Sequence, residues 1–213
     1  MTACTTTTPA VVGADGRGRC PWGSKHDLLA DYHDREWGRE LHGRDNLFER
    51  ISLEAFQSGL SWLVVLRKRP AFREAFAGFD PETVAAFDDD DDDGLLGDAG
   101  IVRNRAKILA TRGNARAVLA LPDAGEDLDA LLWSFAPSPR PPRPTVVEDV
   151  AATTDASTAM AKALRARGFR FVGPTTCYAL MQATGMVDDH LTGCFRTVSR
   201  PTDPFRHDTP SPG

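Results

Sequence analysis

Two cysteines and up to three histidines occur in positions that could build a metal site. The segment DDHLTGC (188–194) places His190 and Cys194 four residues apart, and CPWGSKHDLLADYHDREWG (20–38) supplies Cys20 with His26 or His33. Two thiolates and two imidazoles suit tetrahedral zinc, with bonds of about 2.3 Å to sulfur and about 2.0 to 2.1 Å to nitrogen. Spacing alone does not choose between His26 and His33. It also leaves open that these are an ordinary buried cysteine pair and unrelated histidines.

A single ion bound by these residues would join the two ends of the sequence. Cys20 and His190 enclose more than 150 residues, so metal affinity would be coupled to folding. Four protein ligands leave no open position, which is the arrangement of a structural rather than a catalytic zinc.

Aromatic residues gather in the same N-terminal region around one carboxylate. The chain has only four Trp and two Tyr, yet four of these six lie within 41 residues, namely Trp22, Tyr32, Trp37 and Trp62. Glu54 follows Leu47 and Ile51 at helical spacing, so it lies on the inward stripe of its predicted helix. It is either a core glutamate with a buried partner or a pocket carboxylate, which with aromatic walls would suit a flat cationic ligand.

The stretch GFRFVGPTTCYALMQATG (168–185) contains a Gly-Pro-Thr turn at the start of a predicted helix. Free backbone N–H groups and the positive end of the helix dipole make such a turn a natural phosphate site, although many helices begin this way for capping alone. The net charge of −5 is uneven, because residues 80–98 hold nine acids and no Lys or Arg, so the rest of the chain sums to +4. A basic face on an acidic protein is therefore possible.

The apolar spacing predicts an all-α protein of about eight helices, without a hairpin of strands. Asp45 is the expected N-cap of the helix in 44–59, and the next helix, 62–79 with Ser61 as its cap, is expected to break near Pro70. Further helices are predicted in 80–87, 101–121, 157–168 and 174–185. The run of six Asp at 88–93 is expected to be a solvated loop or a helix start.

Composition predicts one folded domain, residues 19–198, between a loose N-terminal tail, 1–18, and a Pro-rich C-terminal tail, 199–213. No apolar run approaches the ~20 residues that a membrane helix needs, and no secretion signal precedes the four cysteines. We therefore expect a soluble, cytoplasmic protein without a disulfide framework and without a membrane partner.

The motifs taken together resemble the DNA-3-methyladenine glycosylase I family of bacterial alkylation-repair enzymes. The matching stretches occur in the family's order over residues 19–196 and are RCPWG, YHDREWG, LEAFQSGLSW, DAGIVRNRAKI, NARA, WSF, GFRFVGPTTCYALMQATGMVDDH and the final GC. The resemblance implies a helix-hairpin-helix glycosylase fold, with helices around a cleft and a zinc site that joins the N- and C-terminal segments.

The resemblance also assigns roles to particular residues. The zinc ligands would be Cys20, His33, His190 and Cys194, and not His26. Glu54 would act in catalysis and, with Trp22, Tyr32, Trp37 and Trp62, would hold an extruded 3-methyladenine. Gly59 and Leu60 would fill the gap left in the duplex, and the hairpin with Gly173 and Thr175 would grip a phosphate.

The implied activity is hydrolytic release of 3-methyladenine from double-stranded alkylated DNA by a monomer, with the free base as product. No lysine stands in the pocket stretches to form a Schiff base, so strand cleavage is not expected. Two other classes remain possible: a zinc-containing helix-hairpin-helix DNA-binding module without catalysis, and a zinc-dependent nucleobase hydrolase or deaminase.

The sequence departs from the family at two positions near the site. Leu29 replaces a tyrosine, so one polar aromatic wall is expected to be absent. Asp188 replaces an asparagine. It is either a carboxylate that stabilises the transition state or a turn residue that orients His190, and we favour the second role.

Overall fold

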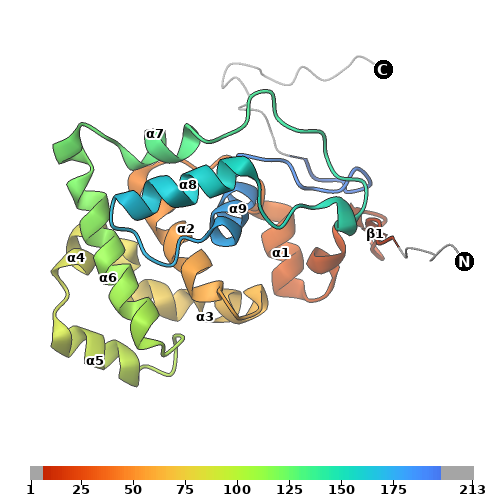
Figure 1. The fold of residues 1–213 in the computed structure, drawn as a ribbon. Coiled ribbons are helices and arrows are strands. Elements are labelled where there is room, and N and C mark those ends of the chain that lie inside the picture. The colour runs from red at the N-terminus through yellow and green to blue at the C-terminus, as the bar shows by residue number, and fades with distance from the viewer. Residues whose placement is uncertain (1–6, 198–213) are drawn as a thin grey trace, which may run out of the picture.

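Nine α-helices form most of residues 7–197, the part of the chain that this computed structural model describes (Figure 1). Their bounds are α1 Asp27–Arg35, α2 Arg44–Gln57, α3 Trp62–Ala75, α4 Pro81–Ala86, α5 Asp89–Gly97, α6 Arg105–Ala120, α7 Leu128–Trp133, α8 Asp155–Ala166 and α9 Pro174–Ala183. Short 3-10 helices lie at Pro21–Ser24, Ala77–Phe79, Pro122–Ala124 and Val147–Asp149. The all-α prediction is confirmed.

The run of six Asp begins a helix, which was one of the two predictions for it. Asp88 accepts hydrogen bonds from the backbone N–H groups of Asp90 and Asp91, and the Asp91 side chain accepts one from the N–H of Asp88. This capping box begins α5, and the acids of its first turn face the positive end of the helix dipole. Arg112 of α6 pairs with the buried Asp92 at 2.9 Å, so part of the charge is neutralised within the fold.

Two local predictions about helices were wrong, and helix α1 was missed. α3 runs through Pro70 without a break, because proline removes one backbone hydrogen bond while buried Phe72 holds the following turn in the core. α2 is capped at Gly43, whose N–H donates to the Asp129 carboxylate of α7, and Asp45 lies in its first turn. Helix α1 was not predicted, since the metal and aromatic residues obscure its apolar stripe.

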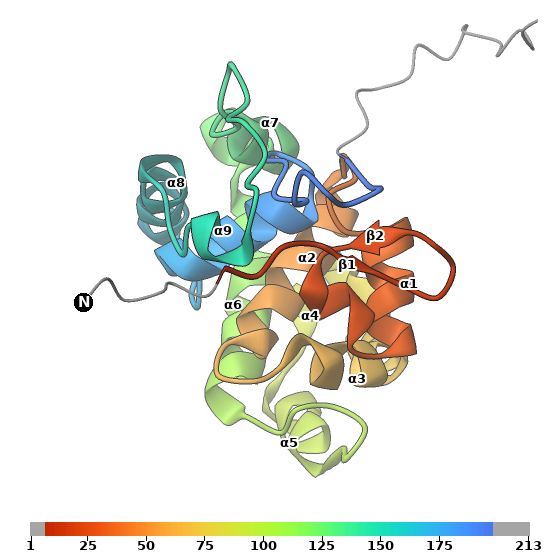
Figure 2. The same cartoon turned by 90° about the vertical axis from the view of Figure 1, so that its right-hand side faces the viewer.

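The described part of the predicted N-terminal tail is a packed hairpin. Strand β1, Val11–Val12, pairs antiparallel with β2, Gly18–Arg19, and Figure 2 shows the pair beside α1. Arg19 donates to Asp34 of α1, and Thr8 donates to Glu148, so long-range contacts hold this segment. The predictions of a loose segment and of no strand hairpin fail for residues 7–18. The C-terminal tail, 199–213, lies outside the described residues.

Helix α2 is central to the core and packs against α3, α6 and α9. Its apolar face meets a cluster of phenylalanine rings with centroids 4.6–6.3 Å apart, made by Phe48, Phe56, Phe72, Phe76 and Phe79. α8 packs against α9, and the short connection 167–173 between them forms the hairpin of the expected helix-hairpin-helix.

The connection between α7 and α8 passes over one side of the molecule toward the N-terminal hairpin (Figure 1). Within it, the Arg143 guanidinium donates to the backbone carbonyls of His190, Cys194 and Arg196 at 2.9, 3.2 and 2.9 Å. This Pro-rich segment therefore supports the C-terminal segment 190–196, which carries two of the candidate metal ligands, His190 and Cys194. None of the helices in the described residues is long and apolar enough to cross a membrane.

Candidate active site and metal centre

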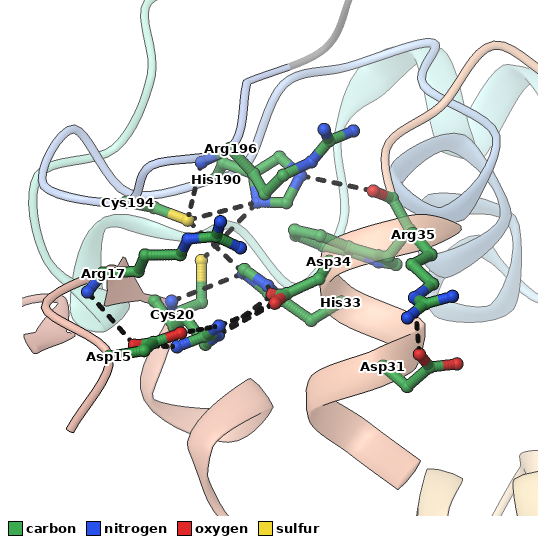
Figure 3. A network of polar contacts seen from close by, with 12 residues as sticks. Asp15, Arg17, Cys20, Asp31, His33, Asp34, Arg35, His190, Cys194 and Arg196 are labelled. Atoms are coloured by element: carbon green, nitrogen blue, oxygen red, sulfur yellow. Dashed lines mark hydrogen bonds and ion pairs between the residues drawn. The ribbon is translucent and has the colours of Figure 1, made fainter. Parts of the chain in front are cut away.

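The four predicted metal ligands converge on one point. Cys20, His33, His190 and Cys194 are buried, and their ligand atoms all lie within 4.8 Å of one another. Figure 3 shows both sulfurs and both imidazole rings directed toward a common centre. The segments that carry them come from opposite ends of the described chain, as the sequence predicted.

The spacing of the donor atoms fits a tetrahedral ion. Bonds of the usual zinc lengths imply a distance of about 3.6 Å between a sulfur and a nitrogen ligand. The observed distances are 3.4 Å from Cys194 Sγ to His33 Nε2, 3.7 Å from Cys194 Sγ to His190 Nδ1, and 3.9 Å from Cys20 Sγ to His190 Nδ1. The donor set can therefore hold a metal ion without rearranging.

Neighbouring groups orient each ligand. His33 Nδ1 lies 2.8 Å from the Asp34 carboxylate and His190 Nε2 lies 3.2 Å from the Trp37 carbonyl oxygen, which leaves the other nitrogen of each ring directed at the centre. The N–H groups of Leu191 and Arg196 donate to the sulfurs of Cys20 and Cys194. The Cys20 thiol, and then both histidines, lower the pKa of Cys194, which favours the thiolate form that binds metals.

His26 does not belong to this group. It is the N-cap of α1, and its Nδ1 accepts a hydrogen bond from the N–H of Leu28. The choice between His26 and His33 that spacing left open is therefore made by helix α1, which turns His33 inward.

The two ends of the chain meet tightly beside the metal ligands. The Phe195 N–H donates to the Gly18 carbonyl oxygen at 2.8 Å, and a Cβ on Gly18 would lie 2.2 Å from the carbonyl oxygen of Gly193. Only glycine allows this approach of the two backbones.

A pocket of about 260 Å³ adjoins the metal ligands. It is lined by Cys20, Trp22, Tyr32, Trp37, Glu54, Gln57, Trp62, Val147, Val150, Ala179, Gln182, Asp189 and Leu191. All five residues predicted for a substrate pocket are among them. The Trp22 ring meets the Trp37 ring edge-on, with 5.1 Å between the ring centroids, and the centroids of the Tyr32 and Trp62 rings lie 5.3 Å apart. Leu29 is buried and is not among the residues that line the pocket.

Glu54 supplies a buried carboxylate to this pocket. It is only 5% exposed, and within residues 7–197 no group donates a hydrogen bond to it. Burial raises its pKa to about 7, and the nearby positive charge of Arg50 opposes the rise. Of the two readings left open by the sequence, the structure favours the pocket carboxylate over the satisfied core glutamate.

Three polar residues of the pocket lining were not predicted, namely Gln57, Gln182 and Asp189. Arg50, which is outside the lining but contacts two of its rings, was not predicted either. Arg50, one turn before Glu54 on α2, lies 5.4 Å from the Tyr32 ring and 5.7 Å from the Trp62 ring. The sequence could have indicated Arg50, because residues four apart on a helix, such as Arg50 and Glu54, lie on the same face. Asp189 lines the pocket and accepts hydrogen bonds at 2.7 Å from Tyr178 and Gln182 through one oxygen.

Asp188 has a different environment from Asp189. It is buried, accepts from the N–H of His190 at 3.3 Å and from the Thr197 hydroxyl at 2.6 Å, and is absent from the pocket lining. These contacts favour the turn role over the catalytic one.

The residues predicted to meet DNA lie in the connection between α2 and α3, and at the point where the connection between α8 and α9 enters the first turn of α9. Gly59 and Leu60 fall between α2 and α3, where Gly59 has φ +81° and Leu60 is 37% exposed. Gly173 is the N-cap of α9, and Thr175 lies in its first turn. Both connections follow or precede helices that also line the pocket.

Comparisons with known proteins agree with this arrangement. The methyladenine glycosylase family model matches residues 22–197. The chain is 47% identical to DNA-3-methyladenine glycosylase 1 of Escherichia coli over 177 residues, which are 83% of this chain and 95% of that protein. It is 45% identical to DNA-3-methyladenine glycosylase of Haemophilus influenzae over 181 residues, which are 83% of this chain and 96% of that protein.

Solved structures show the same fold. A crystal structure of 3-methyladenine DNA glycosylase I superposes with a TM-score of 0.80 at 46% identity, covering 83% of this chain and 98% of the other. The Staphylococcus aureus enzyme, studied for its recognition of 3-methyladenine, gives a TM-score of 0.78 at 34% identity over 83% of this chain and 94% of the other. This protein therefore belongs to the methyladenine glycosylase family.

Proposed function

We propose that this protein removes 3-methyladenine from alkylated DNA by hydrolysis and leaves an abasic site. The observation that carries the proposal is the buried Glu54 carboxylate, which accepts no hydrogen bond from residues 7–197 and lies in a pocket walled by aromatic rings, in a chain that belongs to this family. The relatives that match it are named for the same base.

The pocket has the chemistry that an N3-alkylated adenine requires. Alkylation makes the base cationic, so aromatic faces and an ionised carboxylate favour it over ordinary adenine. Trp62 adds a buried indole N–H that has no hydrogen-bond partner among the described residues. Glu54 is thus proposed to bond the base edge, with Trp22, Tyr32, Trp37 and Trp62 as the walls.

The reaction needs little acid catalysis, because the alkylated base departs as a neutral molecule. The protein would supply extraction of the nucleotide from the stack and stabilisation of the positive charge that develops on the sugar while water attacks. Glu54 and Asp189 are the carboxylates of the pocket lining that could supply negative charge. No lysine is among the residues that line the described pocket, which supports hydrolysis without a Schiff base or strand cleavage.

The two connections are proposed to hold the duplex. The exposed Leu60 side chain would fill the space left by the extruded nucleotide, with Gly59 allowing the turn. The backbone N–H groups at Gly173 and Thr175, at the positive end of α9, would bind a phosphate.

The metal centre is proposed to bind zinc in a structural role. Cys20, His33, His190 and Cys194 would fill all four positions, and the ion would fasten the C-terminal segment to α1 beside the pocket. A zinc-dependent hydrolase or deaminase needs an open coordination position, so the donor set does not favour that alternative.

The test is to incubate the protein with methylated duplex DNA and to identify the released bases by chromatography. Release of 3-methyladenine with intact strands is expected. Duplex binding without release of any base would select the non-catalytic DNA-binding module. Release that stops when the metal is chelated from the still folded protein, and resumes when zinc is added back, would select a metal hydrolase.

A further inference from the structure

Helix α6 carries a buried lysine whose charge is directed at the loop between α2 and α3. Lys107 is 7% exposed, and its Nζ donates to the carbonyl oxygens of Phe56 at 2.9 Å and Ser58 at 2.5 Å. These carbonyls end α2, where the helix dipole is negative, so a cation is stabilised there. Burial lowers the pKa of Lys107, which shows that its position is costly unless the carbonyls hold it.

The contact determines the path of the loop that holds Gly59 and Leu60. Lys107 bonds to the carbonyl oxygen of Ser58, the residue before Gly59, and Gln57 Nε2 donates to the carbonyl oxygen of Leu60, the residue after it, at 3.0 Å. The Leu60 N–H returns to the Gln57 carbonyl oxygen at 2.7 Å. The exposed Leu60 side chain is therefore presented by a loop whose backbone is bonded at both ends.

A second buried polar side chain of α6 holds the other connection. Asn114 is 1% exposed, donates through Nδ2 to the Arg170 carbonyl oxygen at 3.1 Å, and accepts from the Arg170 N–H at 2.7 Å. Arg170 precedes Phe171, which has the positive φ of +55°, and the chain then reaches Gly173 at the start of α9. The amide thus fixes the backbone next to a strained residue of the hairpin.

Lys107 and Asn114 lie seven residues apart on one helix, which is two turns and about 10.5 Å along the axis. We propose that α6 holds the 58–61 loop and the 167–173 hairpin at a fixed separation through Lys107 and Asn114, and so positions both on the duplex without touching it. The inference rests on the proposed function, in which these two connections contact DNA. Both side chains are positioning residues, because neither lines the pocket.

The test compares Lys107→Met and Asn114→Ala with Thr111→Val. Thr111 lies between the two and is also buried, but among residues 7–197 its hydroxyl bonds only within the helix, to the Lys107 carbonyl oxygen. If Asn114→Ala does not fold, Asn114→Asp keeps the acceptor for the Arg170 N–H and removes the donor. Three quantities are measured: amide hydrogen exchange of the free protein, affinity for free 3-methyladenine, and single-turnover excision from methylated duplex over a range of salt.

Lys107→Met is expected to speed exchange at the Leu60 amide at least fivefold, and Asn114→Ala to do the same at Arg170, each without changing the other loop. Excision should slow at least tenfold, while affinity for the free base stays within about twofold, because the pocket is intact. The dependence of duplex binding on salt should keep its slope, since no phosphate contact is lost. Thr111→Val should change none of these.

Three results would overturn the inference. Unchanged exchange at both loops would show that α6 does not position them. A loss of free-base affinity as large as the loss of excision would place the effect in the pocket, and a salt slope reduced by about one would make Lys107 a direct phosphate contact. If the unmodified protein released no base, the proposed function would fail, while the exchange data would still decide whether α6 holds the loops.

Discussion

The Arg50 guanidinium donates a hydrogen bond through Nη1 to the hydroxyl oxygen of Tyr32 at 2.9 Å. Because that oxygen accepts from Arg50, the proton of Tyr32 is left to donate to another group. Tyr32 also lines the pocket. Burial raises the pKa of Tyr32, so the hydroxyl keeps its proton. Arg50, a buried cation in contact with the Tyr32 and Trp62 rings, thus donates to the Tyr32 hydroxyl and opposes the rise in the pKa of Glu54 that burial causes.

Arg50→Met should raise the pKa of Glu54 above its value of about 7, because the positive charge that stabilises the carboxylate is removed. The measurement is an NMR titration of the carboxyl carbon of Glu54. Arg69→Met is the control, since Arg69 pairs with Glu36 and not with the pocket. A midpoint that moves down, or moves equally in both variants, contradicts the assignment of Arg50.

The pH dependence of stability should report the burial of Glu54. An acid with a pKa of about 7 in the folded protein and 4.5 in the unfolded chain is favoured when protonated, so its stabilising contribution is present below pH 4.5 and is lost as pH rises through 7. This shift of the pKa changes the free energy of unfolding by roughly 3 kcal/mol at most. Glu54→Gln should therefore gain stability relative to wild type between pH 5 and pH 8 in urea unfolding. If the free energies of unfolding of Glu54→Gln and wild type differed by the same amount at every pH, the pKa of Glu54 would not be raised by folding.

Glu54→Gln should weaken binding of free 3-methyladenine by about tenfold or more with the fold intact, because a charged hydrogen bond contributes about 1.5 to 3 kcal/mol. Calorimetry measures the affinity. Glu49→Gln on the same helix is the matched control, since Glu49 pairs with Arg73 and does not line the pocket. Equal affinities in wild type and Glu54→Gln would remove this carboxylate from the binding site.

Cys194→Ala should release the metal and lower the melting temperature by about 10 °C, since ~3 kcal/mol of metal coupling corresponds to that shift in a chain of this size. Elemental analysis and thermal unfolding measure the two effects together. Cys177→Ala tests a buried cysteine outside the ligand group and should retain the metal. Purified wild-type protein without zinc would refute the assignment of the ion.

Asp188→Asn should leave single-turnover excision within about threefold of wild type. Asparagine keeps one oxygen to accept from the His190 N–H, and its NH2 group can donate to the Thr197 hydroxyl oxygen in place of the second carboxylate oxygen. Asp189 rather than Asp188 lines the pocket. Metal content and melting temperature serve as controls. A loss of a hundredfold or more with both unchanged would make Asp188 a catalytic carboxylate.

The residue types and order of the chain determined the fold class and most of the chemistry. Helical spacing placed Glu54 on the inward face of α2, and that placement holds because periodicity within one helix is a local property. The motif order led to the same four metal ligands that converge in the structure. Local capping rules also explained how six consecutive aspartates begin α5.

Contacts between distant segments were decided only by the tertiary structure. Spacing could not separate His26 from His33, because the choice depends on which face of α1 meets His190. The hairpin at residues 7–19 has little apolar pattern and is held by Asp34 and Glu148, partners that lie far along the chain. Pro70 continues α3 because burial of the following turn outweighs one missing hydrogen bond. The clamps from Lys107 and Asn114 likewise cross more than 45 residues, so no local pattern in the sequence could reveal them.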